Sequence, residues 1–579
     1  MTKSDVIDHI DYLIAMVLGV IVFFYYWWGI DALEIFRHTE ADRALIGWEM
    51  RERGDYIIPH LLGSPIFTKP PLFYWLIALV TELFNSNQVA VVRFPSLFFA
   101  SAYCVFQYFF LRFSSFERQA AIIGTLIFAF GAMFYIHAAQ AEMDMVFSVF
   151  CWMSLCLIFF AEGKRALPIT VVSYLLAGLA FLVKGPPAII ILIFINFIYY
   201  IFRMNSSAQT RNKWWQFCKL NIAGLVIFAS VVGGWLISLV SQMSWQEVIF
   251  WLDAEFYNRI FTEARYKRGA LYYLPLIIEG AFPWSLALLL LAATLPFSTC
   301  RNYIKESSIW SKQRKFIVFN LISVLTITVL LSFSAGKSGR YFLPAYAFVI
   351  NLCLVAALVV ADSPWREKAY KLCAIVVFVL VPGLIFSVLI SERAMSLFAD
   401  FPLGLGLITL ALVFIVICMW FPCFRNAGLV LSCVLFYLAI RYNYIYGYSE
   451  MRNQERSVLA AVRVIDSVTP KGEPIYNIEL FERWISYYLK LNGRISYRLD
   501  VKRRGELLEQ SGALHVLLNE EEEMWRLKVL QKNGVSYDVL AKVEDTPNPV
   551  ILIRVAPEAL RYWGVQERFP TVPTPPYSL

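Results

Sequence analysis

The chain has 579 residues, of which 59% are hydrophobic and only 16% are charged, and its formal net charge is +8. Soluble globular proteins carry roughly 25% charged residues. The composition therefore excludes an ordinary soluble enzyme, a disordered protein and a nucleic-acid-binding module. In a membrane protein a mild positive charge reports topology, because lysine and arginine collect in the loops on the cytoplasmic side.

Thirteen apolar stretches approach the length that a spanning helix needs, about 20 mostly apolar residues. The first follows one early lysine and precedes no small-residue cleavage site, so we interpret it as a retained helix. The run 72–84 is apolar but short and aromatic, and we expect an interfacial helix there. The predicted spans are 12–30, 90–111, 119–137, 143–161, 168–183, 187–202, 220–241, 273–297, 316–333, 341–361, 372–391, 403–421 and 427–446.

The connections between these spans divide into two sets by charge. One set is short and basic, for example EGKRA and SPWREKAYK, and the other includes two long loops, 31–89 and 242–272. The positive-inside rule assigns the basic set to the cytoplasm. This assignment puts the N-terminus inside, and the two long loops and the C-terminus outside. Counting 72–84 as a span would move the basic loops to the wrong side.

The chain changes character after residue 446. Residues 447–579 are more polar, and strand-like runs alternate with helix-like runs there, which is typical of a small α/β domain. We therefore predict a membrane domain over 1–446 and an outer α/β domain over 447–579 that acts as a scaffold or lid. The expected strands are 473–480, 494–499, 513–520, 536–541 and 549–555, and the expected helices are 481–491, 503–510 and 521–533.

Neither the cysteines nor the histidines form a metal-binding pattern. The ten cysteines lie in or beside apolar runs without CxxC spacing, which favours packing over a zinc site or a disulfide framework. His38, His60 and His137 have no HxxxH or HExxH partner, so we expect structural roles for them. No cofactor is required by the sequence, and the use of a divalent metal is left open.

The first outer loop holds two candidate catalytic carboxylates. Glu40 and Asp42 open a helical stretch after Thr39, a plausible N-cap. Carboxylates there could simply stabilise the helix through their interaction with its dipole. Alternatively, one of them could activate an acceptor at the membrane surface. Further along the same loop, Lys69 lies in the motif TKPP, where it could snorkel to the interface or bind a lipid phosphate.

A second acidic pair, Glu142 and Asp144, begins the predicted span 143–161. A charge at this depth needs a partner or a water-filled cavity. We rank Asp144 above Glu142 as a catalytic candidate because Asp144 lies deeper in the span. The simpler alternative is a salt bridge that ties helices together.

Several cations lie on the predicted outer side, where the positive-inside rule expects few. Clamping an anionic headgroup or phosphate is the simplest function for such a set. For any one of them, anchoring to lipid headgroups is an equal alternative. The candidates are Lys184, Arg259, Arg265, Lys337 and Arg340, with Lys267 and Arg268 beside them. Carboxylates and cations together suit the transfer of a group from a lipid phosphate, in which the phosphate leaves.

Several motifs of the membrane part resemble those of GT-C superfamily glycosyltransferases. These are GDYIIPHLLGSPIFTKPPLFYWL, VRFPS, AEMDMVF, FLVKGPPA, LYYLPLIIEGAFPW and FSAGKSGRYFLPAY. The chain looks most like the lipid A aminoarabinose transferase (ArnT) family and, behind it, the protein O-mannosyltransferases. This resemblance implies thirteen spans, catalysis at the periplasmic face of the bacterial inner membrane and a periplasmic C-terminal domain.

The resemblance also implies a reaction, which takes a sugar from an undecaprenyl-phosphate carrier and inverts its anomeric centre. By position, Lys69 and Arg259 match residues that contact the phosphate, and Tyr341 is expected to help them. Asp144 matches the second acidic residue of the family.

The first outer loop departs from the family pattern. The family usually opens this loop with an Asp-Glu pair followed by x-Arg, whereas this chain has Thr39-Glu40-Ala41-Asp42, and Arg43 comes one position late. Either Glu40 or Asp42 has taken the acidic role, or the site handles a different acceptor. A phosphate acceptor is already an anion and hardly needs a base, whereas a hydroxyl acceptor does.

Three hypotheses follow from these observations. The favoured one is a lipid-linked sugar transferase with lipid A as the acceptor. The second keeps the donor and changes the acceptor to a protein hydroxyl or another envelope glycan. The third is a transporter or flippase of the polyprenyl lipid, which we favour less because the charges lie at helix ends and no internal repeat is seen.

Overall fold

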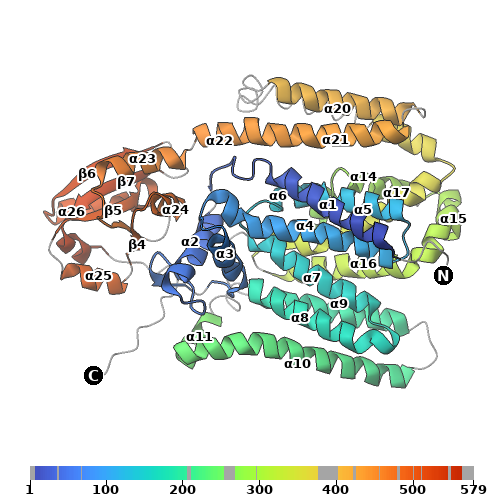
Figure 1. Cartoon of the computed structure of the whole chain (residues 1–579), viewed down its shortest axis with the longest axis horizontal. Helices are drawn as coiled ribbons and strands as arrows, with labels where there is room; N and C mark the ends of the chain where they lie inside the picture. Colours follow the sequence, from blue (N-terminus) through green and yellow to red (C-terminus); the bar gives the residue numbers. More distant parts are fainter. Residues whose placement is uncertain are drawn as a thin grey trace.

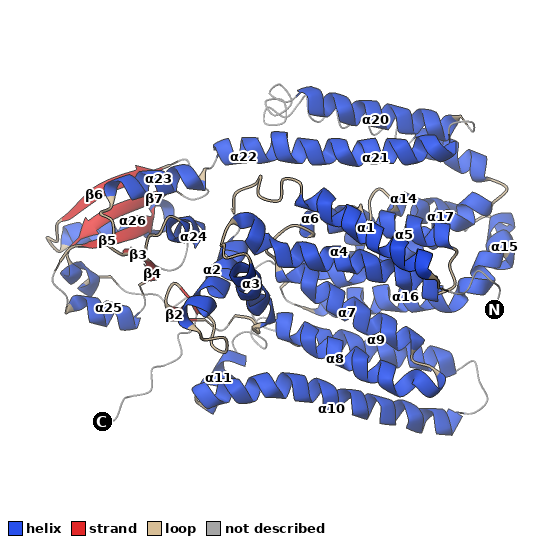
Figure 2. Ribbon diagram, in the orientation of Figure 1, coloured by secondary structure: helices blue, strands red, loops and turns tan. Residues whose placement is uncertain are grey.

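The computed structural model describes most of the chain, and it is predominantly helical (Figure 2). The described residues are 7–35, 38–66, 68–204, 210–252, 268–294, 296–334, 336–375, 402–421, 425–455, 457–478, 483–499, 501–509, 512–544 and 549–563. Helices run side by side along the length of the molecule, and a small sheet with its helices lies at one end (Figure 1).

Within the described residues, eight helices are long and apolar enough to cross a membrane. Each coincides with a predicted span to within a few residues, except that α10 and α16 begin eight or more residues before the predicted starts at 220 and 316. The chain is thus a polytopic α-helical membrane protein. The helices that carry these spans are α1 (His9–Trp27), α4 (Val89–Phe113), α7 (Met143–Phe160), α8 (Ala166–Lys184), α9 (Pro187–Met204), α10 (Thr210–Gln242), α16 (Ser308–Phe333) and α17 (Leu343–Asp362).

The remaining predicted spans are interrupted or fall partly outside the described residues. The span 119–137 is divided into α5 (Arg118–Ala129) and α6 (Ala132–His137), and the span 273–297 into α13 (Tyr273–Glu279) and α14 (Ser285–Thr294). Two more spans appear as α20 (Pro402–Trp420) and α21 (Arg425–Asn443). Residues 376–391 of the predicted span 372–391 lie outside the described part of the chain.

The break between α5 and α6 lies at Gly131, which the sequence pattern alone does not reveal. A Cβ at Gly131 would collide with the hydroxyl of Tyr346. Tyrosine hydroxyls from other helices instead bind the carbonyls that α5 leaves open. Tyr346 donates to Phe128 O at 2.6 Å, Tyr26 to Ala129 O at 2.8 Å and Tyr437 to Phe130 O at 2.6 Å. Backbone groups at membrane depth need such partners.

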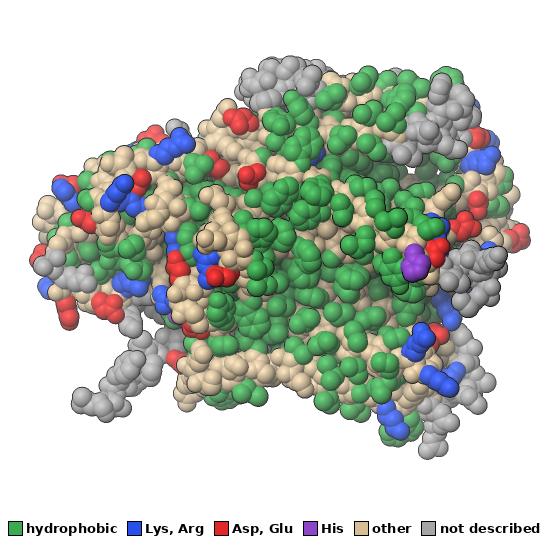
Figure 3. Space-filling view, in the orientation of Figure 1, with side chains coloured by type: hydrophobic (Ala, Val, Ile, Leu, Met, Phe, Trp, Pro, Cys, Tyr) green, Lys and Arg blue, Asp and Glu red, His purple; other side chains and the backbone are tan. Residues whose placement is uncertain are grey.

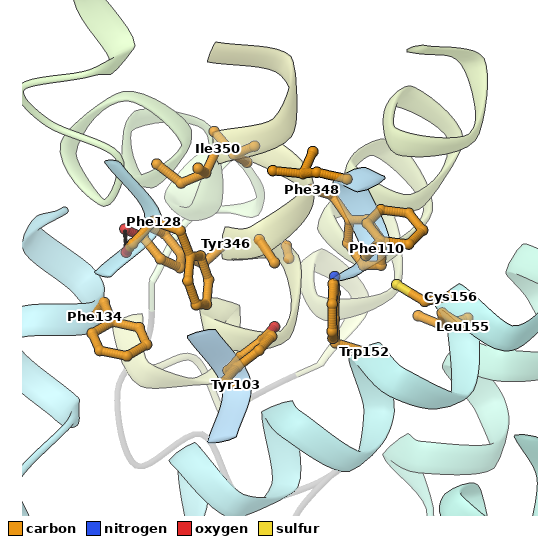
Figure 4. Packing of buried hydrophobic residues seen from close by; sticks show 14 of the residues in the cluster. Tyr103, Phe110, Phe128, Phe134, Trp152, Leu155, Cys156, Tyr346, Phe348 and Ile350 are labelled. Atoms are coloured by element: carbon orange, nitrogen blue, oxygen red, sulfur yellow. Dashed lines mark hydrogen bonds between the residues drawn. The ribbon is translucent and has the colours of Figure 1, made fainter. Parts of the chain in front are cut away.

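The largest core cluster is aromatic and lies between α4, α5, α7 and α17 (Figure 4). The ring of Tyr103 packs against Trp152 and Phe128, with centroids 4.9 and 4.6 Å apart. Such packing holds helices together in lipid, where apolar burial gives little driving force between them. It fixes α17, the most enclosed of the eight spans, with 83% of its apolar window buried.

The two ends of the helical bundle differ. At one end, here called the sheet end, lie α2 (His38–Arg53), the short hairpin of β1 (His60–Leu61) and β2 (Ser64–Pro65), and α3 (Leu72–Leu83). Trp75 of α3 donates to Tyr56 O at 2.6 Å, and α4 begins at the same end. With 12 residues, α3 is shorter than the helices that could cross a membrane.

The opposite end, here called the basic end, carries the N-terminus and the short basic connections. Asp11 near the start of α1 pairs there with Arg112 of α4 and Arg118 of α5, at 2.9 and 3.2 Å. Between the two ends the surface is largely apolar, whereas charged side chains gather at the ends (Figure 3). The start of α1 and the C-terminal sheet thus lie on opposite sides of the apolar band, as the loop charges predict.

The C-terminal elements form a five-stranded mixed sheet with strand order β4-β3-β5-β7-β6. The pairs β3–β4 and β3–β5 are parallel, and β5–β7 and β6–β7 are antiparallel. All five strands and three helices expected from the sequence are present, together with α23, which was not predicted. They are β3 (Ile475–Asn477), α24 (Arg483–Leu491), β4 (Ser496–Arg498), α25 (Val501–Leu508), β5 (Leu514–Asn519), α26 (Glu520–Lys532), β6 (Tyr537–Val543), β7 (Val550–Val555) and α23 (Val458–Val468).

Smaller elements complete the described chain. They are η2 (Gly163–Arg165), α11 (Trp245–Leu252), η4 (Ala270–Tyr272), α15 (Ser298–Glu306), η5 (Gly339–Phe342), the π-helical turn η7 (Tyr444–Tyr448), α22 (Ser449–Glu455) and η8 (Pro557–Arg561).

We expect Tyr346→Phe to lower the free energy of unfolding by about 1–3 kcal/mol, because it leaves the buried Phe128 carbonyl without its donor. Thermal unfolding of the detergent-solubilised protein measures the effect. Tyr12→Phe is the matched control, since Tyr12 is 56% exposed, and it should change stability by less than about 0.5 kcal/mol. Equal melting temperatures for Tyr346→Phe and the wild type would contradict this account of the helix break.

Candidate functional site

One face of α2 carries Thr39 and Arg43, which contact Glu142 together. Four residues apart on a helix, their side chains lie on the same face. The Thr39 hydroxyl donates to Glu142, and Arg43 pairs with the same carboxylate at 2.9 Å and also donates to Thr39 O. Thr39 lies inside the first turn of α2, so its hydroxyl binds Glu142 rather than capping the helix as the sequence suggests.

Glu142 and Asp144 stand at the start of α7, where the helix dipole favours carboxylates. Both are buried, with exposed fractions of 0% and 1%. Arg340 lies between them, 3.3 Å from Glu142 Oε2 and 3.9 Å from Asp144 Oδ2. Lys184, the last residue of α8, forms an ion pair with Asp144. The two carboxylates are therefore joined through one guanidinium.

Aromatic rings cover the lysine of this cluster. Lys184 Nζ lies 4.5 Å from the centroid of the Tyr341 ring and 5.3 Å from that of Phe147. The guanidinium of Arg340 lies 5.9 Å from the Tyr341 ring. Cation–π contacts of this kind are stronger where water is excluded. Tyr341 thus fixes both cations beside Asp144.

The cluster has a positive surplus among the described residues. Three cations, Arg43, Lys184 and Arg340, face the two carboxylates Glu142 and Asp144. The Nε groups of Arg43 and Arg340 are buried donors that make no hydrogen bond within the described residues, although Arg340 Nε forms the 3.9 Å ion pair with Asp144. The side chain of Arg340 is 27% exposed. An anion that reaches Arg340 would therefore meet net positive charge and unused donors.

Glu40 lies beside this cluster but in a neutral pair of its own. Both of its oxygens bind Arg93 of α4, each at 3.0 Å, and one also accepts from Ala141 N at 2.7 Å. Arg93 donates in addition to Ile30 O and Leu33 O. The pair is buried on both sides, with exposed fractions of 3% and 2%. These contacts suit Glu40 to positioning α2 rather than to proton transfer.

Asp42 is engaged by the C-terminal region. It forms an ion pair with Arg483 of α24. Burial raises the pKa of Asp42, and the nearby Arg483 and Arg43 oppose that rise. Because successive helix positions are rotated by about 100°, Asp42 and Arg43 face different partners.

Two further contacts join the first outer loop to the C-terminal elements. Glu34 accepts from the N–H groups of Val458 and Leu459 at the start of α23, at 2.8 and 3.3 Å. Burial raises the pKa of Glu34, and these backbone donors oppose the rise. On the exposed side of α2, Glu52 pairs with Lys490 at 2.7 Å.

The remaining predicted phosphate ligands are Lys337, Lys69, Arg259 and Arg265, of which Lys337 and Lys69 lie among the described residues. Lys337 is 7% exposed and donates to Ser334 O at 2.8 Å, where it caps the end of α16. Lys69 lies half-buried in the first outer loop. Arg259 and Arg265 lie outside the described residues, as does Lys267.

Three arginines at the site were not among the residues predicted from the sequence: Arg43, Arg93 and Arg483. The spacing from Thr39 to Arg43 could have indicated a shared helix face. The VRFPS motif contains Arg93, but nothing local to it identifies Glu40 as its partner. Arg483 lies more than 400 residues from Asp42, so only the fold connects them. Within the described residues, no group of three or more His, Cys, Asp or Glu side chains is arranged to hold a metal ion.

The chain is similar in sequence to known membrane transferases. Residues 68–235 match the family described as dolichyl-phosphate-mannose-protein mannosyltransferase. The undecaprenyl phosphate-α-4-amino-4-deoxy-L-arabinose arabinosyl transferase of Yersinia enterocolitica is 24% identical over 396 residues, covering 64% of this chain and 65% of that protein. The enzyme of the same name from Serratia proteamaculans is 25% identical over 387 residues, covering 62% of each. The chain thus spans slightly less than two thirds of the length of these relatives.

Comparison of structures extends the similarity to nearly the whole chain. The crystal structure of ArnT from Cupriavidus metallidurans bound to undecaprenyl phosphate aligns with a TM-score of 0.69 and 15% identity, covering 94% of this chain and 98% of that one. The apo structure of the same protein aligns with a TM-score of 0.68. The chain therefore has the GT-C fold of ArnT, and the resemblance predicted from its motifs is confirmed.

Because Glu40 and Arg93 are both fully buried, we expect Glu40→Ala to leave an uncompensated guanidinium and to lower the free energy of unfolding by about 3–5 kcal/mol. Glu52→Ala on the same helix is the control, since its pair with Lys490 is exposed and should contribute at most about 1 kcal/mol. Thermal or denaturant unfolding of both variants provides the measurement. If the two variants lose the same stability, the anchoring role of Glu40 is wrong.

Proposed function

We propose that this ArnT-like protein with a GT-C fold is an inverting glycosyltransferase of the bacterial inner membrane. It moves a sugar from a polyprenyl phosphate carrier, undecaprenyl phosphate by likeness to the relatives above, to an acceptor of the cell envelope. The observation that carries this proposal is the net positive cluster of Glu142, Asp144, Arg43, Lys184 and Arg340 at the sheet end of the bundle.

The positive surplus suits the leaving group. When the bond between the sugar C1 and the phosphate oxygen breaks, the electron pair stays on the oxygen, and the phosphate gains negative charge. Preorganised cations in a site that excludes water stabilise such charge far better than water does. Arg340 is the cation best placed to receive it, because it is partly exposed and its Nε makes no hydrogen bond among the described residues. In this proposal Lys69, Lys184, Lys337, Arg259 and Tyr341 also bind the donor, and Arg265 is a secondary candidate.

Asp144 is the carboxylate proposed to act on the incoming nucleophile. In an inverting transfer the acceptor oxygen attacks C1 from the face opposite the phosphate. A hydroxyl acceptor must also give up its proton, which a carboxylate can accept. Glu142, Glu40 and Asp42 join α7, α2, α4 and α24 through Arg43, Arg93 and Arg483, and we assign them to positioning Asp144 and the helices around it.

The favoured acceptor is lipid A. The first outer loop departs from the family pattern at Thr39 and Asp42, and this bears on the choice of acceptor. Its two carboxylates are both paired, Asp42 with Arg483 and Glu40 with Arg93. Neither is left to serve as a base, and a phosphate acceptor such as that of lipid A needs none. A protein hydroxyl or another envelope glycan is the alternative acceptor, and it would rely on Asp144. A transporter of the polyprenyl lipid is less favoured, because the ion pairs of the described site lie at helix ends.

We further propose that the sheet end faces the periplasm. The support is the positive-inside rule, since the short basic connections gather at the other end with the N-terminus. The two domains are proposed to be 1–446 and 447–579. In this arrangement the C-terminal α/β domain acts as a scaffold that holds α2 through Asp42 and the preceding loop through Glu34.

If Asp144 and Lys69 are in the site, then Asp144→Asn and Lys69→Ala should each lower sugar transfer by about 100-fold or more, in line with the loss of a positioned acid–base or charged group. The assay follows transfer from undecaprenyl-phosphate-linked sugar with purified protein. Both variants should insert and purify normally, and Glu52→Gln should retain wild-type activity. Normal transfer by both variants would refute the site assignment.

The acceptor is tested by mass spectrometry of lipid A from cells with and without the gene. We expect the two spectra to differ by the mass of one added sugar. Unchanged lipid A together with a changed glycan or glycoprotein profile would show that the alternative acceptor is correct. Unchanged profiles of all three would contradict the proposed transferase activity.

A further inference from the structure

A second polar pocket lies at the basic end of the bundle, where α7, η2, α8, α9 and α10 meet. Its volume is about 290 Å³. It begins where α7 ends, whereas Asp144 lies in the first turn of that helix. Asp144 lies 16 residues before the end of α7 at Phe160. At a rise of 1.5 Å per residue this separates the two sites by roughly 24 Å along the helix, most of the thickness of a hydrocarbon core, about 30 Å. The pocket therefore lies at the opposite membrane interface from the proposed transfer site.

The interior of this pocket has an unused hydrogen-bonding group. Tyr199 is 1% exposed and lines the pocket, and its hydroxyl has no hydrogen-bond partner within the described residues. Buried hydroxyls are normally bonded. The hydroxyl of the neighbouring Tyr200 is also buried and lacks a partner there. Both tyrosines line the cavity, and their hydroxyls are two buried donors for which the described part of the chain supplies no acceptor.

Another polar group of the lining, the side chain of Asn221, already has hydrogen-bond partners within the protein. Asn221 Oδ1 accepts from Asn196 Nδ2 at 2.7 Å and from the Tyr174 hydroxyl, and Asn221 Nδ2 donates to Phe217 O at 2.8 Å. This network joins α8, α9 and α10 at one wall of the pocket. A wall whose polar groups are satisfied keeps its shape without a ligand.

Cations line the same pocket, with one carboxylate. Arg203 and Lys213 are lining residues, and so is Glu162, which lies 3.0 Å from Arg203 and 3.8 Å from Lys315. The side chains of Arg203 and Glu162 are 33% and 46% exposed. An exposed ion pair of this kind contributes little to stability. An anionic ligand can thus displace Glu162 from Arg203 at little cost.

Aromatic side chains place the mouth of the pocket at the level of lipid headgroups. Tyr200 and Phe217 stack with centroids 4.0 Å apart, and Trp214 stacks on Phe217 at 5.8 Å. Trp214 and its neighbour Trp215 are 44% and 60% exposed. Exposed tryptophans beside basic residues at a helix end are typical of the membrane interface.

From these observations we propose that the pocket binds the phosphate of an anionic phospholipid headgroup in the leaflet opposite the transfer site. Arg203 and Lys213 pair with the phosphate, and the Tyr199 and Tyr200 hydroxyls donate to its oxygens. The exposed tryptophans favour a lipid over free phosphate as the source. The inference does not depend on the proposed sugar transfer, since it concerns other residues at the other end of the bundle.

The test measures lipid binding to the purified full-length protein by native mass spectrometry and by thermal stabilisation. The probes are phosphatidylglycerol, phosphatidylcholine and inorganic phosphate. We expect phosphatidylglycerol to be retained and to raise the melting temperature, and the other two to have little effect. Stabilisation by inorganic phosphate equal to that by phosphatidylglycerol would overturn the assignment to a lipid, and equal effects of the two lipids would overturn the headgroup selectivity.

Variants connect the binding to this pocket. Combining Arg203→Gln with Lys213→Gln should weaken the apparent affinity for phosphatidylglycerol by about tenfold or more, as expected for charge-assisted hydrogen bonds. Tyr199→Phe keeps the packed ring and should also weaken binding. Arg366→Gln is the matched control, because Arg366 follows α17 at the basic end, is 61% exposed in its side chain and does not line the pocket. Wild-type affinity in both the double variant and Tyr199→Phe would refute the site, and equal loss in Arg366→Gln would show a general charge effect instead.

Discussion

The carboxylate of Glu142 joins three separate parts of the chain at the sheet end. Arg43 and the Thr39 hydroxyl reach it from α2, Arg340 reaches it from η5, and its own backbone leads into α7. Glu142 is fully buried, so its charge must be compensated within the protein. The placement of Asp144 two residues later, and of Lys184 and Arg340 around it, depends on this junction.

The neighbouring ion pairs add rigidity rather than charge. Glu40 with Arg93, and Asp42 with Arg483, are each one carboxylate facing one guanidinium, so they leave the surplus of the Glu142 cluster unchanged. They fix α2 against α4 on one side and against α24 on the other. A site held this way can keep its cations close together before any ligand arrives, which is what electrostatic stabilisation of a leaving phosphate requires.

Much of the fold could be predicted from the sequence, because spanning helices and charged loops can be recognised from the composition of short stretches of the chain. The charge of the loops separates the short apolar run 72–84 from the predicted spans, and the strands of the C-terminal sheet follow from local alternation. The break at Gly131 could not be predicted, since it depends on Tyr346 approaching from α17. The same holds for the ion pairs of Glu40 and Asp42, because their partners Arg93 and Arg483 lie far away in the sequence.

The central claim is that the cluster around Glu142 and Asp144 holds a phosphate through Arg340, and it is tested most directly by binding rather than by turnover. The measurement is the affinity of the purified protein for undecaprenyl phosphate without a sugar, compared between the wild type, Arg340→Gln and the exposed control Arg366→Gln. The account predicts that Arg340→Gln weakens binding by about tenfold or more, because a charged hydrogen bond to phosphate is lost, and that the control binds normally. Equal affinity of the wild type and Arg340→Gln would contradict it.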